Sequence, residues 1–136
     1  MGLAERRATK DFQEKSLPAL RAEIDKLAGK TLELDINWEQ LAKEDHGANY
    51  EEFWRKVYFQ PVITALKSIA RDDLGKEAIQ AGFCKITCCD TRGAYSPESA
   101  ISFTGGELTI DHSPTSNVDD VEARAKHIIE IVEKAL

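Results

Sequence analysis

Apolar positions along the chain follow two different periods, and the changes of period predict where helices give way to strands. Residues 3–28 have apolar side chains at helical spacing and end at Gly29, so we expect helix that is kinked, or begun again, at Pro18. Residues 31–38 alternate instead, with apolar side chains at Leu32, Leu34, Ile36 and Trp38. This alternation predicts a half-buried strand whose outer face carries Glu33 and Asp35.

The middle of the chain is predicted to be helical, with interruptions. Asn37 precedes a short helix in WEQLAKE, and Asn49 with Glu52 has the spacing of a capping box that begins a longer helix. Because proline lacks an N–H and clashes with the preceding turn, Pro61 predicts a kink or break near residue 60. A further helix is expected over residues 72–81, capped by Asp72.

The last third of the chain has the pattern of three strands followed by a helix. Residues 83–90 predict one strand, and residues 99–111 predict a hairpin that turns at Gly105 and Gly106. The apolar stripe from Val121 to Val132 predicts the final helix. The expected cross-strand pairs of the hairpin are Phe103 with Leu108 and Ile101 with Ile110.

This order of elements predicts an α+β fold in a single domain spanning residues 1–136. The strands are grouped apart from most of the helices, and at least one pair forms a clear hairpin. We therefore expect a two-layer sandwich in which helices pack on one face of a largely antiparallel sheet of about four strands.

Composition and charge narrow the classes of function. No stretch is apolar enough for a membrane span or the core of a secretion signal, and an odd number of cysteines, three, favours a reducing compartment, so we expect a cytoplasmic protein. The net charge of −6 argues against nucleic-acid binding, which depends on clustered basic residues. Residues 31–52 hold seven acidic residues and one lysine, so this segment alone accounts for the net charge.

All three cysteines lie in the segment CKITCCDT, residues 84–91. On a strand, Cys84 and Cys88 share a face but lie roughly 13 Å apart, too far to bind one zinc ion or to form a disulfide. We expect both to belong to the core. Cys89 points to the other face beside Lys85, and a neighbouring lysine can lower the pKa of a thiol, so Cys89 is the candidate for a reactive cysteine.

The segment TIDHSP places Asp111, His112 and Ser113 in a row. Adjacent residues of a strand point to opposite faces, whereas a catalytic triad must converge on one point, so a strand end followed by a turn is the simpler interpretation. If the protein is an enzyme with a pocket near the exposed face of the sheet, the residues to test are Cys89, Asp111 and His112. No spacing of ligands predicts a metal site, and no glycine-rich loop predicts a nucleotide or other cofactor.

Half of the ten aromatic residues lie between residues 50 and 59. Tyr50, Trp54 and Tyr58 repeat at helical spacing, which is typical of core packing, but an exposed Trp or Tyr here would be a good anchor for a protein partner. The neighbouring acidic segment either keeps the protein soluble or attracts a basic partner. The candidate partner-binding residues are Glu33, Asp35, Glu44, Asp45, Glu51, Glu52, Trp54 and Tyr58.

The segments EFWRKVYFQP, RDDLG and LTIDHSPTSNVDD resemble a group of small bacterial proteins of similar length with no assigned activity. In size, acidity and lack of a catalytic constellation, the chain also resembles the immunity proteins that neutralise bacterial toxins. The second resemblance implies a binding protein, but it rests on no motif and therefore assigns no residue a role.

The leading hypothesis is thus a cytoplasmic, non-enzymatic domain that binds a basic protein partner and neutralises a toxin. One alternative is a small enzyme with a thiol or a His/Asp site on the exposed sheet face. Another is a subunit of a homo-oligomer whose interface covers the aromatic side chains.

Overall fold

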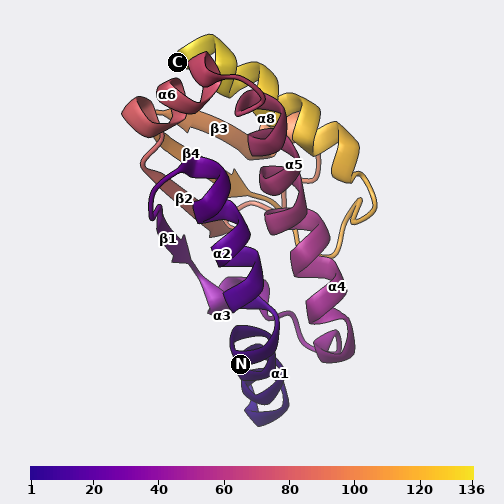
Figure 1. The fold of residues 1–136 in the computed structure, drawn as a ribbon. Coiled ribbons are helices and arrows are strands. Elements are labelled where there is room, and N and C mark those ends of the chain that lie inside the picture. Colours follow the sequence, from indigo (N-terminus) through magenta and orange to yellow (C-terminus); the bar gives the residue numbers. More distant parts are fainter.

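The chain forms one four-stranded sheet, seen in the computed structural model of residues 1–136 (Figure 1). The strands are β1 (Glu33–Ile36), β2 (Lys85–Cys89), β3 (Ile101–Thr104) and β4 (Glu107–Asp111), arranged in the order β1-β2-β4-β3. The α+β class and the four strands agree with the sequence-based prediction. None of the helices combines the length and apolar composition that a bilayer span requires.

The prediction of a largely antiparallel sheet is wrong. β1 pairs with β2 in parallel, β2 pairs with β4 in parallel, and only β3 and β4 are antiparallel. Parallel neighbours need a long crossover connection, and the helical block between β1 and β2 provides one. Alternation of apolar residues defines the two faces of a strand, but it does not define the direction of its neighbour. The hairpin was predicted correctly, including its register.

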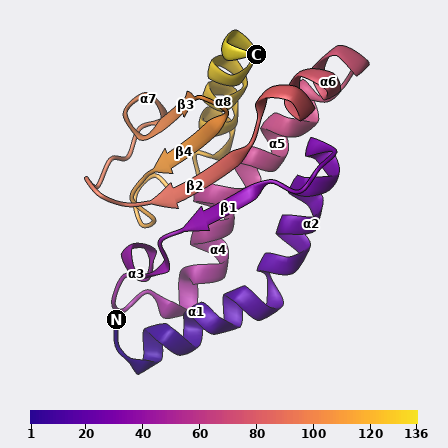
Figure 2. The same cartoon turned by 90° about the vertical axis from the view of Figure 1, so that its left-hand side faces the viewer.

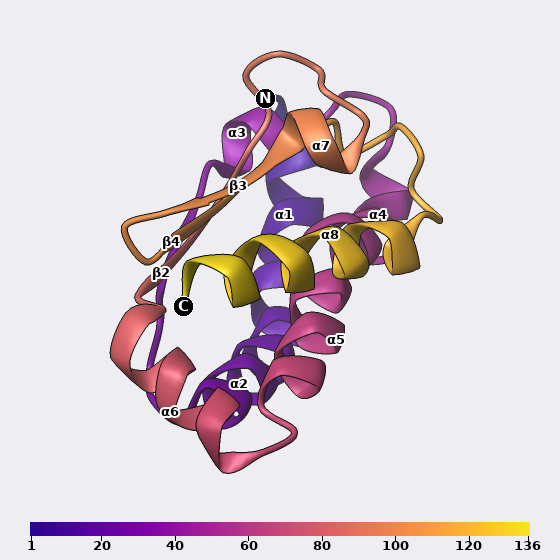
Figure 3. The same ribbon diagram turned by 90° about the horizontal axis from the view of Figure 1, so that it is seen from above.

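Helices cover one side of this sheet, as Figures 2 and 3 show for α2 (Leu17–Ala28), α5 (Gln60–Ile69) and α8 (Val121–Ala135). The remaining helices are α1 (Leu3–Lys15), α3 (Trp38–Leu41), α4 (Tyr50–Trp54), α6 (Asp73–Gly82) and α7 (Pro97–Ala100), with a short 3₁₀ turn at Gly47–Asn49. The strands turn apolar side chains toward the helices, and the buried ones include Ile86, Cys88, Ile101, Leu108 and Ile110. The opposite side of the sheet carries polar side chains.

Local signals for helix ends were mostly correct. Gly29 ends α2 in the left-handed conformation with φ of 73°, and Ser16 alone separates α1 from α2. The side chains of Asn37 and Asp72 each accept a hydrogen bond from the first turn of the following helix. The predicted capping box at Asn49 is wrong, because its side chain makes no capping bond and Glu52 bonds to Lys56 instead.

The interruption predicted near residue 60 is a π-helical segment, Arg55–Phe59, that joins α4 to α5. Here the Gln60 N–H donates to the carbonyl of Arg55, five residues earlier. The wider turn accommodates Pro61, whose ring would otherwise meet the carbonyl four residues before it. The helix therefore continues through the proline, and its widened turn leaves backbone carbonyls that need other partners.

Candidate functional site

Polar and ionisable side chains of all four strands lie together on the side of the sheet that the helices leave uncovered. We call it the open sheet face. All of its side chains are partly or largely exposed, and they alternate along the strands with the buried side chains of the core. They are Glu33 and Asp35 of β1, Lys85, Thr87 and Cys89 of β2, Glu107, Thr109 and Asp111 of β4, and Ser102 and Thr104 of β3.

Three charged residues at the β1 end of this face form a unit that we call the acidic edge: Glu33, Asp35 and Lys85. Strand register places Glu33 directly opposite Lys85. The Lys85 ammonium lies 3.2 Å from a Glu33 carboxylate oxygen and 3.7 Å from one of Asp35. The two carboxylates remain 68% and 63% exposed, whereas the lysine is 28% exposed. The single positive charge of Lys85 is thus shared by two exposed carboxylates, and the acidic edge has a net charge of −1.

Cys89 and Asp111 are opposite each other in the β2–β4 register at the other end of the face. Burial and then the Asp111 carboxylate raise the pKa of Cys89 to about 11. The prediction that Lys85 lowers the pKa of Cys89 is therefore wrong. Lys85 lies four residues before Cys89 in the strand, and its ammonium pairs with Glu33 and Asp35 of β1. At neutral pH Cys89 is a protonated thiol and a poor nucleophile.

Asp111 holds the loop that follows β2. It accepts hydrogen bonds from the N–H of Thr91 at 2.7 Å and from the Thr91 hydroxyl, and the Arg92 guanidinium lies 3.4 Å away. Burial opposes its ionisation, but the bonds from Thr91 and Arg92 outweigh that effect and hold the pKa of Asp111 below its usual range. Because its oxygens already accept these hydrogen bonds and its pKa is low, the Asp111 carboxylate is a poor general base.

His112 lies on the helix-covered side, away from Cys89 and Asp111. Its side chain is completely buried, and Nδ1 lies 2.6 Å from the carbonyl of Ser113. Burial lowers the pKa of His112, so the ring is neutral at neutral pH. The structure thus brings Cys89 and Asp111 together but separates both from His112.

The other cysteines have different environments. Cys88 is buried in the core as expected, and burial raises the pKa of its thiol. Cys84 is exposed, so its assignment to the core is wrong. The strand begins only at Lys85, and the Cys84 N–H bonds instead to the carbonyl of Gly106 in the hairpin turn. All three thiols are free.

Trp54 and Tyr58, proposed above as partner anchors, have no exposed surface. Trp54 packs against Tyr50 with ring centroids 4.3 Å apart and against Phe12 at 5.1 Å, and its indole N–H donates to the Leu41 carbonyl. The aromatic stripe is therefore core, and the interface role of Trp54 and Tyr58 is wrong for the folded protein.

The remaining candidate acids do not join the acidic edge. On α4, Glu51 pairs with Arg55 at 3.1 Å and Glu52 with Lys56 at 3.0 Å. Figure 1 shows β1 and α4 well apart, on either side of α2. Glu44 and Asp45 are exposed in the loop after α3 and form no ion pair. The acidic segment of the sequence is thus divided in space, and its α4 part is locally neutralised.

Sequence reasoning missed a buried polar cluster made by Tyr58, His112 and Arg124. The Tyr58 hydroxyl donates to the His112 carbonyl at 2.5 Å. Arg124 of α8 is completely buried, and its guanidinium donates to three backbone carbonyls, at Asn117, Val118 and Lys56. A sequence signal existed, because Arg124 lies three residues after Val121 and four before Ile128, within the apolar stripe of the helix.

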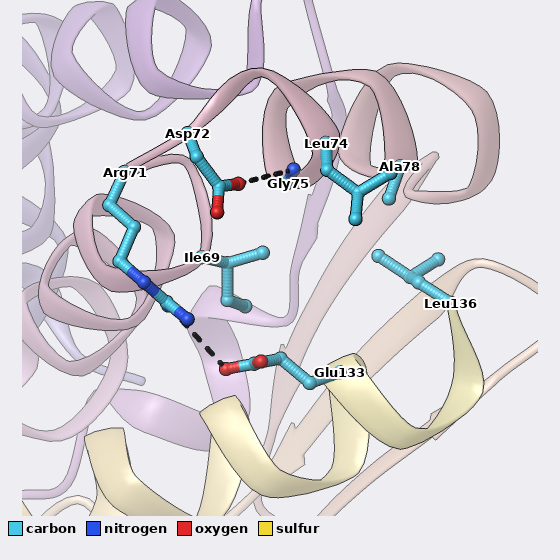
Figure 4. Close-up of a pocket in the computed structure, with 8 residues that line it drawn as sticks. All are labelled: Ile69, Arg71, Asp72, Leu74, Gly75, Ala78, Glu133 and Leu136. Atoms are coloured by element: carbon cyan, nitrogen blue, oxygen red, sulfur yellow. Dashed lines mark hydrogen bonds and ion pairs between the residues drawn. The ribbon is translucent and has the colours of Figure 1, made fainter.

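A shallow hollow of about 300 Å³ lies between α6 and the ends of α5 and α8 (Figure 4). Leu74, Ala78 and Leu136 line one side, and on the other the Arg71 guanidinium lies 4.0 Å from the Glu133 carboxylate. The hollow is at the small end of the range for ligand pockets. Its charged side chains are already bonded within the protein.

The structure contains no group of three or more His, Cys, Asp or Glu side chains placed to hold a metal ion. Comparisons of the chain with protein families, with curated protein sequences and with solved structures found no match.

Proposed function

We propose that the protein is a non-enzymatic domain that binds a basic protein partner through the acidic edge. The observation that carries this proposal is the pair of exposed carboxylates of Glu33 and Asp35 sharing one lysine on an uncovered sheet face. Such a surface attracts a basic partner by electrostatic steering and complementarity. The resemblance to immunity proteins favours a toxin as that partner.

The chemistry of the open sheet face supports binding over catalysis. A thiol with a pKa of about 11 is not an effective nucleophile at neutral pH. The nearby carboxylate of Asp111 is engaged by Thr91, and the imidazole of His112 is buried on the other side of the sheet. An enzymatic mechanism would need a nucleophile and a base within hydrogen-bonding reach of each other.

Affinity capture from a lysate of the source organism, with identification of the captured protein, tests the proposal. A basic protein should be captured at about 50 mM salt and largely lost at about 300 mM, because exposed charges are screened more strongly as the Debye length shortens. Capture should also be lost with the double variant Glu33→Lys/Asp35→Lys.

Glu122→Lys/Glu130→Lys is the matched control, since it makes the same change in net charge at exposed positions of α8. This variant should still capture the partner. The proposal is wrong if capture is indifferent to salt and to the variant of β1, or if both double variants abolish it equally.

A further inference from the structure

We infer that the outer edge of β1 accepts an extended segment of the basic partner as an additional strand. The segment would carry Lys or Arg at alternate positions with aliphatic residues between them. This inference rests on the proposed function and gives it a binding mode. In Figure 1, β1 lies at the outer edge of the sheet, and β2 is its only strand neighbour.

The backbone of β1 has unpaired groups along this edge. The N–H groups of Glu33 and Asn37 point toward β2: that of Glu33 donates to the carbonyl of Cys84, just before β2, at 3.1 Å, and that of Asn37 donates to the Cys88 carbonyl at 3.0 Å. In a parallel ladder the backbone groups of successive residues point to opposite sides, so those of Leu34 and Ile36 point away from β2. No turn, loop or side chain bonds to them.

The open part of the edge has definite ends. At Leu32, whose backbone groups point the same way, the N–H donates to the Asp25 carboxylate at 3.0 Å and the carbonyl accepts from Arg21 at 2.7 Å. Beyond Ile36 the chain turns into α3 at Asn37. Two residues therefore offer two donors and two acceptors, enough to align a short peptide but not a long strand.

Side chains on the two faces of β1 specify the incoming residues. Residues of an added strand that face the open side would lie beside Glu33 and Asp35, where opposite charges on neighbouring strands are stabilising. Lys85 already flanks the two acids from β2 and leaves one negative charge unmatched. Leu34 and Ile36 are half-buried against the core, so aliphatic residues of the partner would extend it.

A second copy of this chain is a poorer occupant. Pairing β1 with β1 would place Glu33 and Asp35 against the same acids of the other copy, and like charges on adjacent strands destabilise pairing. Short edges lined with charge also prevent aggregation of sheets. The same acids therefore oppose self-association and favour a basic strand.

The probe is a capped hexapeptide of alternating Lys and Val, titrated into the full chain and followed by NMR. Two further hexapeptides of the same sequence are N-methylated at alternate amides, one at the first, third and fifth and the other at the second, fourth and sixth. Both keep the charge, but only one of them lacks the N–H groups that would face β1. We expect amide hydrogen exchange at Leu34 and Ile36 to slow at least tenfold with the unmodified peptide. Exchange at Glu33, whose N–H already bonds to β2, should not change.

The unmodified peptide should also bind at least tenfold more tightly than the weaker of the two methylated peptides, whereas the other, methylated at the amides that point away from β1, should keep most of the affinity. Glu33→Gln/Asp35→Asn should reduce the affinity of the unmodified peptide at least tenfold. Equal binding of all peptides with the same dependence on the two acids would overturn strand addition and leave the proposed basic partner intact. Slow exchange at Leu34 and Ile36 without any peptide, together with a dimer in sedimentation, would assign the edge to a second copy and also overturn the inference.

Discussion

The buried polar cluster and the acidic edge both contain charged side chains, but water reaches only the second. Arg124 is completely buried and donates to three backbone carbonyls, so its charge is held by backbone dipoles without a direct ion pair. Glu33 and Asp35 keep most of their exposure and share one lysine. Charge in the first region holds the chain in place, whereas charge in the second remains available to a partner.

The cluster also explains how the π-helical segment is tolerated. A widened turn leaves carbonyl groups without their usual helical donors, and Arg124 of α8 donates to one of them, at Lys56, over 3.1 Å. The same guanidinium fixes the loop before α8 through Asn117 and Val118. Irregular helical turns often mark functional sites, but here the freed carbonyl is satisfied inside the protein.

The largest expected effect is at Arg124. The substitution Arg124→Met should lower the free energy of unfolding by about 3 kcal/mol or more, because three backbone carbonyls lose the donor that a buried guanidinium supplies. Urea unfolding measures this change. Lys126→Met is the control on the exposed side of the same helix and should change stability by less than about 0.5 kcal/mol. Equal effects of the two variants would contradict a structural role for the buried cluster.

The next effect concerns Cys89, the thiol of the open sheet face. With a pKa of about 11, Cys89 should react with a disulfide reagent at pH 7.5 about 10- to 100-fold more slowly than a free cysteine, since few molecules carry the thiolate. The rate is measured in Cys84→Ser/Cys88→Ala, which leaves this thiol alone, and unfolding in urea should restore the ordinary rate. A native rate above that of free cysteine would revive the enzymatic hypothesis.

Local patterns in the sequence predicted local structure well. Asn37, Asp72 and Gly29 mark helix ends because each acts on backbone groups within a few residues. The hairpin register followed from the two-residue turn and the alternation of Phe103 and Leu108. These features depend on short-range geometry, which the sequence displays directly.

Features that depend on contacts between distant segments were not predictable in the same way. β1 and β2 are separated by a long helical block, and nothing in either strand indicates that they pair in parallel. The acidic residues of 31–52 are neighbours in sequence, but the fold places Glu33 and Asp35 on the sheet and Glu51 on a helix beside Arg55. The exposure of Glu33 and Asp35 on one face of a strand was predicted correctly, and their role in binding stays a prediction. The exposed aromatic anchors were wrong, because Trp54 and Tyr58 are buried.

A smaller effect is expected from pH at His112. The unfolded chain binds a proton there near pH 6.5, whereas burial lowers the pKa in the folded protein. Keeping His112 neutral therefore costs nothing above about pH 6.5. As the pH falls from there toward the lower pKa of His112 in the folded protein, the free energy of unfolding decreases by at most about 1.4 kcal/mol per pH unit. The measurement is the free energy of unfolding at pH 7.5, 6.5 and 5.5.

The variant His112→Gln should remove this slope. The control His46→Gln keeps the buried imidazole and should therefore keep the slope. The assignment of the slope to His112 is wrong if the free energy of unfolding rises as the pH falls through this range. It is also wrong if the His112→Gln and His46→Gln variants show the same slope.

The smallest effect on stability should come from the acidic edge itself. Glu33→Gln/Asp35→Asn removes two ion pairs with Lys85, but exposed pairs contribute only about 0–1 kcal/mol because water and salt screen them. Urea unfolding should therefore give nearly the wild-type midpoint, in contrast to Arg124→Met. A loss of more than about 2 kcal/mol would mean that these acids hold the sheet together. A small loss, combined with lost capture of the basic partner, is the result expected of residues whose role is recognition.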